Sequence, residues 1–108
     1  MILINVKFPV KPEVADSWPE KIAEFTNATR AEEGNVFFEW SRSINNPNEY
    51  VLLEAFRDAE AGDAHVNSDH FKKAMGEIPD YISAQPKIIY NGDAPDGGWG
   101  PMAELSPR

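Results

Sequence analysis

Hydrophobic and polar side chains alternate along residues 1–10, and this pattern predicts a β-strand. Residues 36–44 alternate in the same way, and an apolar stretch at 50–57 follows the turn signal Asn-Asn-Pro-Asn at 45–48. These two stretches therefore predict a β-hairpin. A last strand is expected over residues 86–90, where a proline precedes another apolar run.

Two further regions have the features of helices. One helix is predicted from Ser17, which fits an N-cap with a glutamate three residues later, to about Glu33. Its apolar residues lie on one side, as expected for a helix that packs on a sheet. A second helix is predicted over about 59–67, and Ser68 is expected to cap an offset continuation through Met75.

The resulting order, β-α-β-β-α-β, is typical of the ferredoxin-like α+β fold with an antiparallel sheet. Residues 1–90 would form this single domain. Two helices can cover only one face of the sheet, yet the other face carries apolar residues as well. A second copy of the chain is the most economical cover for that face, so the pattern predicts a homodimer.

The C-terminal segment, residues 91–108, differs from the domain in composition. Its four glycines and three prolines argue against a regular helix or strand. Trp99, Met102 and Leu105 are nevertheless more apolar than a simple solvated linker requires. Two interpretations stay open: a disordered end, or an arm whose Trp99 docks on the partner subunit or closes a cavity.

Composition and charge narrow the classes of function. A formal net charge of −8 on 108 residues argues against nucleic-acid binding, which needs clustered lysine and arginine. The chain has no cysteine, which excludes disulfides, thiolate metal sites and cysteine nucleophiles. No apolar run approaches the roughly 20 residues needed to cross a bilayer. We therefore expect a cytoplasmic protein without a membrane partner.

The only two histidines, His65 and His70, are the candidate catalytic residues. Imidazole is the one side chain whose ordinary pKa lies near neutrality, so it suits proton transfer. On a continuous helix, five residues turn about 500°, which would place the two rings roughly 140° apart and unable to share a metal. We therefore predict no metal site, with one histidine facing inward as a base or donor and the other capping or solvated.

Five other side chains are candidates for binding a substrate. Trp40 and Phe56 would form an aromatic wall, with Phe71 and Tyr81 near the same space. Asn5 is a polar amide in an apolar strand, so it must face solvent or find a partner inside, where it could hold a substrate oxygen. A packed core is the alternative interpretation of the aromatic residues.

The order of the elements and several short motifs resemble the antibiotic biosynthesis monooxygenase (ABM) domain family over roughly residues 1–90. The motifs are Gly34-Asn35 before the aromatic strand, Phe38-Glu39-Trp40, the strand exit from Glu54 to Asp58, and the His65-to-Phe71 run.

The resemblance implies a dimeric α+β barrel with a pocket between sheet and helices in each subunit, and C-terminal extensions that reach the other chain. It also implies oxidation of a quinol or related polyphenol by dioxygen without a cofactor. His65 or His70 would be the base, Asn5 or a tyrosine the oxyanion donor, and Trp40 and Phe56 the aromatic platform.

Other functions stay open beside this one. A non-catalytic dimeric protein could use the same pocket to bind a small molecule, for example in a stress response. The haem-degrading branch of the family implies an Asn on the first strand, a Trp on the second helix and an axial His. Asn5 matches this pattern, but His65 and Met75 occupy the other two positions, which disfavours haem degradation. The acidic balance disfavours the branch that acts on a phosphorylated sugar.

Overall fold

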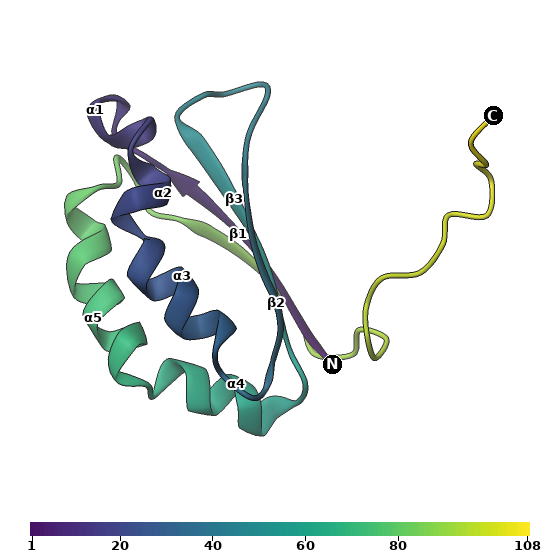
Figure 1. The fold of residues 1–108 in the computed structure, drawn as a ribbon. Coiled ribbons are helices and arrows are strands. Elements are labelled where there is room, and N and C mark those ends of the chain that lie inside the picture. The colour runs from purple at the N-terminus through teal and green to yellow at the C-terminus, as the bar shows by residue number, and fades with distance from the viewer.

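The sheet in the computed structural model, which describes residues 1–108, has four antiparallel strands (Figure 1). They are β1 (Ile2–Pro9), β2 (Asn35–Arg42), β3 (Glu49–Phe56) and β4 (Lys87–Asn91). Their order across the sheet is β2-β3-β1-β4, so β1 lies in the centre and pairs with both β3 and β4. This arrangement confirms the predicted hairpin and the ferredoxin-like α+β fold.

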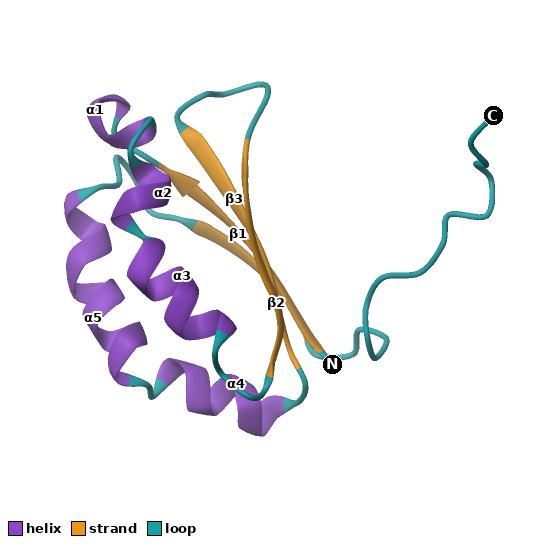
Figure 2. Cartoon of the chain, in the orientation of Figure 1, coloured by secondary structure: helices purple, strands orange, loops and turns teal.

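The helices lie together on one face of the sheet (Figure 2). None of them is long and apolar enough to cross a membrane. Their bounds are α1 (Pro12–Ala15), α2 (Trp18–Lys21), α3 (Ala23–Arg30), α4 (Ala59–Val66), α5 (Asp69–Glu77) and the 3-10 helix η1 (Ile78–Asp80).

The prediction of one helix from Ser17 to Glu33 is wrong. This region forms two short helices, α2 and α3, and α3 ends at Arg30. The backbone at Ile22, with φ −107° and ψ 12°, separates α2 from α3. The Ser17 hydroxyl donates a hydrogen bond to the Val14 carbonyl at 3.1 Å, so it is directed at the preceding turn and does not cap α2.

Aromatic rings fill the core between the helices and the sheet. Trp18 on α2 is fully buried and lies 5.6 Å from Phe8 and 5.9 Å from Tyr50, measured between ring centroids. The Tyr50 hydroxyl donates a hydrogen bond of 2.8 Å to the Ala15 carbonyl, which ties β3 to α1. Buried aromatic pairs of this kind dominate the stability of small cores.

The opposite face of the sheet has no helix over it (Figure 2). Side chains on neighbouring positions of a strand point to opposite faces, so the residues that alternate with the core positions point here. The strand register brings Asn5 between Leu53 and Ile89, and Leu3 beside Ala55. This open face therefore carries an apolar cluster around Asn5, bordered by Lys7, Glu39 and Lys87, and Ile89 has 69% of its surface exposed.

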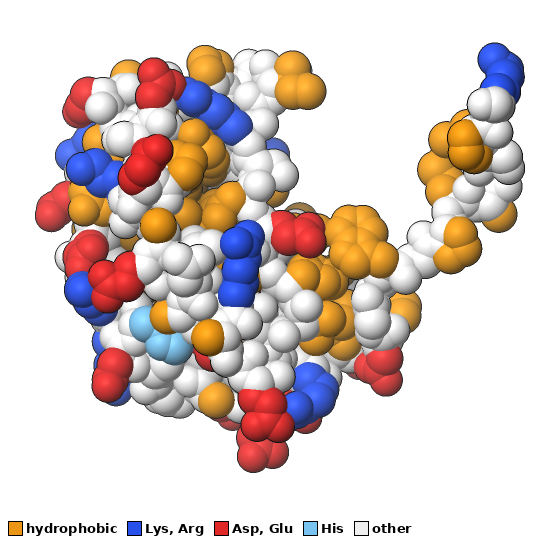
Figure 3. All heavy atoms as spheres, viewed as in Figure 1, with side chains coloured by type: hydrophobic (Ala, Val, Ile, Leu, Met, Phe, Trp, Pro, Cys, Tyr) orange, Lys and Arg blue, Asp and Glu red, His pale blue; other side chains and the backbone are white.

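The tail leaves the body after β4 and extends away from it (Figure 1). Ala94 is buried, and its amide donates to the Met1 carbonyl at 3.1 Å. The Trp99 ring lies 5.9 Å from the Phe37 ring, at the side of the open face, and is still 70% exposed. Hydrophobic side chains gather where the tail leaves the body (Figure 3). Docking of Trp99 on a partner subunit stays a prediction.

A close approach at Gly34 joins the start of β2 to α4. A Cβ atom at Gly34 would lie 2.2 Å from the Cβ of Ala61, which is buried on α4. The Gly34 carbonyl also accepts a hydrogen bond of 2.8 Å from the Arg57 amide. Only glycine allows this contact, and the contact fixes the distance between α4 and the turn that precedes β2.

The substitution Gly34→Ala should destabilise the fold by about 1–3 kcal/mol, because the added methyl group overlaps Ala61 and forces the backbone apart. Urea unfolding would measure the change. Gly62→Ala is the matched control, because a Cβ there meets nothing within 4 Å and alanine favours a helix by about 1 kcal/mol. Equal stability of the two variants would contradict this account of the contact.

Candidate active site

A pocket of about 570 Å³ lies between the sheet and the helices α4 and α5. This volume falls within the range of small-molecule sites, which is roughly 300–1,000 Å³. Only three of its lining residues are polar: Glu54, His65 and Gln85. Lysine and arginine are absent from the lining. Its apolar walls include Ile4, Val6, Phe8, Leu52, Phe71, Met75, Ile78 and Ile88.

His65 projects from α4 and separates this pocket from the carboxylate of Glu32, which does not line the pocket. The residue is buried, with 4% of its surface exposed, and its ring lies 4.7 Å from the Phe56 ring. Its Nδ1 lies 2.8 Å from Glu32 Oε2, and its Nε2 lies 3.8 Å from Glu54 Oε1. An Nδ1–H that donates to Glu32 leaves the lone pair on Nε2, the nitrogen nearer Glu54.

Glu54 is a carboxyl group in an apolar place. It lies on β3 at the parity of Leu52 and Phe56, so strand alternation directs it toward the helices. Burial, together with the negative charge of Glu32, raises the pKa of Glu54 to about 7. Near neutral pH, this carboxyl group can therefore either donate or accept a proton.

The two histidines meet because the helical segment breaks between α4 and α5. Ser68 caps α5 by accepting a hydrogen bond from the Phe71 amide at 3.2 Å, and its hydroxyl donates to the His65 carbonyl at 2.6 Å. The predicted cap and offset are thus confirmed. The angle of roughly 140° calculated for a continuous helix does not apply, because α4 and α5 have different axes.

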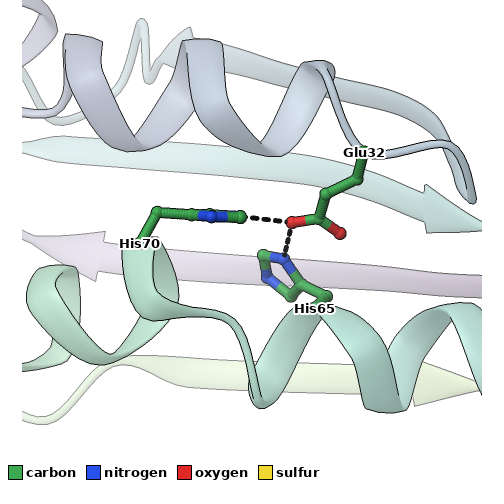
Figure 4. Close-up of side chains that lie close together, drawn as sticks. All are labelled: Glu32, His65 and His70. Atoms are coloured by element: carbon green, nitrogen blue, oxygen red, sulfur yellow. Dashed lines mark hydrogen bonds and ion pairs between the residues drawn. The ribbon is translucent and has the colours of Figure 1, made fainter.

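Glu32 is the point at which the two rings converge (Figure 4). Its Oε2 lies 2.5 Å from His70 Nε2 and 2.8 Å from His65 Nδ1. The ligand atoms of these three residues all lie within 4.8 Å of one another. The prediction that the histidines cannot share a metal is therefore wrong on its geometric ground, since this donor set could hold one cation.

Sequence reasoning missed both carboxylates. Glu54 was detectable, because strand alternation places it on the same face as Leu52 and Phe56. Glu32 gave no such signal, because it lies in a polar stretch after α3 and resembles its solvated neighbour Glu33. Only the tertiary contact with α4 and α5 distinguishes the two glutamates.

The five predicted substrate-binding residues lie in different places. Phe71 lines the pocket, whereas Phe56 does not line it and packs against the His65 ring. Trp40 belongs to the aromatic core, where its Nε1 donates to Thr26 Oγ1 at 2.9 Å. Tyr81 lines a separate groove between α3 and α5. Asn5 alternates with the pocket residues Ile4 and Val6, so it points to the open face of the sheet and does not line the pocket.

Comparison with known proteins matches the family model described as antibiotic biosynthesis monooxygenase to residues 1–77. A Bacillus subtilis (strain 168) protein described as "Putative monooxygenase YcnE" is 26% identical over 89 residues, which cover 82% of this chain and 94% of that protein.

Solved structures have the same fold. A Caulobacter crescentus CB15 protein described as a putative antibiotic biosynthesis monooxygenase aligns with a TM-score of 0.81 and 21% identity, covering 87% of this chain and 90% of that one. A Nitrosomonas europaea protein with the same description aligns with a TM-score of 0.78 and 22% identity, covering 86% of this chain and 98% of that one.

The substitution Glu54→Gln should stabilise the protein in a pH-dependent way. The folded state holds the Glu54 proton more tightly than the unfolded state, whose pKa is near 4.5. Stability from this group is therefore greatest below pH 4.5 and is lost as pH rises toward 7. The loss amounts to roughly 3 kcal/mol. Urea unfolding of both proteins at pH 4 and pH 8 should show the advantage of the variant growing by that amount. An advantage that is the same at both pH values would contradict the assignment.

Proposed function

The chain belongs to the antibiotic biosynthesis monooxygenase family, and from this premise we propose that it is a monooxygenase that oxidises a quinol or related polyphenol with dioxygen. The oxidation needs no cofactor. One observation carries the proposal: an apolar pocket of about 570 Å³ whose only titratable lining groups are Glu54 and His65. These two groups could remove a proton from a neutral aromatic molecule bound in the pocket.

The lining of the pocket supports a flat, uncharged substrate. Apolar walls favour an aromatic ring system through burial of its surface, and Phe71 offers an edge or face for stacking. A carboxylate or phosphate on the substrate would find no lysine or arginine there, and the negative charge of Glu32 behind His65 would repel it.

His65 acts as the general base in this proposal. Glu32 fixes the ring by accepting from Nδ1, so Nε2 can take the proton of a substrate hydroxyl. Glu54, 3.8 Å from Nε2 and with a pKa of about 7, can share that proton. His70 holds Glu32 from its other side and is a positioning residue in this scheme.

The electrons come from the substrate itself. A deprotonated hydroquinone is electron-rich enough to pass an electron to dioxygen, after which the two radicals can combine. For a simple hydroquinone, one oxygen atom enters the ring and the other leaves as water, and the four electrons of the quinol-to-hydroxyquinone change reduce both atoms. The Gln85 amide at the pocket could donate to the developing oxyanion, a role predicted for Asn5.

The substitution His65→Gln should lower the rate of dioxygen consumption with an oxidisable hydroquinone by about 10²–10⁴-fold, the usual contribution of a positioned base. An oxygen electrode would measure the rate on a panel of hydroquinones and hydroxynaphthalenes, after subtraction of the uncatalysed oxidation. Glu33→Gln is the control, because the Glu33 side chain is 94% exposed and its ion pair is with Arg57, outside the pocket. Saturable ligand binding without oxygen uptake would instead support the non-catalytic binding protein.

We also propose that a second copy of the chain covers the open face of the sheet. Leu53 and Ile89 flank Asn5 there, and no helix of the same chain lies over them. Exposed apolar side chains in the middle of a sheet face ordinarily pack on another layer. Pairing two such faces would give the dimeric α+β barrel, with each pocket on the outer side of its own sheet.

The substitution Leu53→Lys should convert the dimer to a monomer of 12.1 kDa, because it places a charge in the middle of the buried face. Sedimentation equilibrium would measure the mass. Asn27→Lys, at an exposed position of α3 on the helical side, adds the same charge and should leave the dimer intact. A wild-type protein that sediments as a monomer would refute the proposed dimer.

A further inference from the structure

We propose that Glu32, His65 and His70 form a binding site for one divalent transition-metal ion, such as zinc or cobalt. Their ligand atoms are a carboxylate oxygen and two ring nitrogens, all within 4.8 Å of one another. Both rings already point at the same oxygen, Glu32 Oε2 (Figure 4). An ion would bridge the three atoms from a position near the one where the two N–H groups now converge.

The chemistry of the donors selects the ion. Neutral imidazole binds zinc, cobalt, nickel and copper well, and one carboxylate completes a common three-residue set with further positions left for water. Oxygen-seeking ions such as calcium and magnesium prefer more carboxylate and carbonyl ligands than this cluster supplies. The proposed ligand is therefore a borderline transition metal.

The charge of Glu32 supports a cation at this position. The side chain is 16% exposed, and the only groups within ion-pairing distance are the two imidazoles. When both rings are neutral, the carboxylate is thus mostly buried without a cationic partner. Buried charges in proteins are usually paired or coordinate metals, so a dication would supply the missing partner.

The surroundings of His65 resemble the outer shell of a metal site. A histidine that binds a metal through one nitrogen usually donates its other N–H to a carboxylate. Glu54 Oε1 lies 3.8 Å from His65 Nε2, on the side opposite Glu32, so a small approach of the two groups would bring this carboxyl into hydrogen-bond distance. The Phe25 ring lies 5.9 Å from the His65 ring and 6.4 Å from the His70 ring, so an apolar side chain packs beside both ligands.

The three ligands belong to separate elements that the fold already holds together. Glu32 follows α3, His65 lies on α4 and His70 lies on α5. The contact of Gly34 with Ala61 sets the distance between the segment that carries Glu32 and the helix that carries His65. His70 is the most accessible ligand, with 24% of its side chain exposed, and it also lines the groove between α3 and α5. An ion could therefore enter from this groove without passing through the substrate pocket.

The ion would lie behind the His65 ring as seen from the pocket, because neither Glu32 nor His70 lines that pocket. It would therefore not touch a bound substrate. Its effect would come through His65: a metal on Nδ1 obliges Nε2 to carry the proton, so the ring can no longer act as a base. This consequence, inhibition of oxygen uptake, rests on the proposed function, whereas binding itself does not.

The test is a metal titration of the untagged protein, after a chelator has removed any bound metal. Visible absorption would monitor the addition of Co²⁺, and calorimetry would monitor the addition of Zn²⁺. We expect one ion per chain and a cobalt spectrum typical of nitrogen and oxygen ligands. Glu32→Gln and His70→Gln should each weaken binding by more than the roughly 10- to 100-fold that outer-shell partners contribute. The proposed site is overturned if the wild-type protein binds no cobalt, or if both variants bind it as tightly as the wild type.

Two controls make the result specific. Glu33→Gln removes the neighbouring exposed carboxylate and should leave cobalt binding unchanged; a loss as large as that of Glu32→Gln would overturn the assignment of ligands. Circular dichroism must show that each variant is folded, which His70→Gln should satisfy because the residue is partly exposed.

Oxygen uptake then separates the two proposals. Activity of the metal-free protein that zinc abolishes and a chelator restores supports both the site and its effect on His65. Tight cobalt binding by a protein that never consumes oxygen overturns the proposed function and leaves the metal site standing. Oxygen uptake by a protein that binds no cobalt supports the proposed function and overturns the metal site.

Discussion

One carboxylate oxygen, Glu32 Oε2, accepts from imidazoles on two different helices, and the arrangement of the whole site depends on it. The interaction orients the His65 ring, determines which of its nitrogens carries the proton, and holds α4 and α5 against the turn before β2. The close contact of Gly34 with Ala61 brings that turn within reach. Removal of the Glu32 carboxylate would free the ring that gives the pocket its chemistry.

Glu54 illustrates the opposition between stability and function at this site. A buried carboxyl group with a pKa of about 7 destabilises the folded protein at neutral pH, and glutamine would occupy the same volume without that cost. A residue that weakens the fold and lies beside a candidate base in a pocket is a strong indication of a functional role. The aromatic core around Trp18, which adjoins the pocket at Phe8, supplies the stability that offsets it.

Much of the fold followed from the sequence because periodicity is a local property. The alternation of residues 1–10 and 36–44, and the cap at Ser68, identified the strands and the break between α4 and α5. The site followed less well, because it depends on contacts between distant residues. The two histidines were found by their chemistry, but Glu32 looks solvated in sequence, and Asn5 and Trp40 were assigned to a pocket that strand parity and core packing exclude them from.

The central position of β1 has a consequence for how the protein is made in the cell. β1 precedes both of its neighbours in the sheet along the chain: it pairs with β3 at residues 49–56 and with β4 at residues 87–91. The nascent polypeptide therefore cannot complete its sheet, or the Ile88 wall of the pocket, until β4 has left the ribosome. β1 can pair with β3 before then, but its other edge, which receives β4, stays open, and chaperone contact with that edge during synthesis would be advantageous.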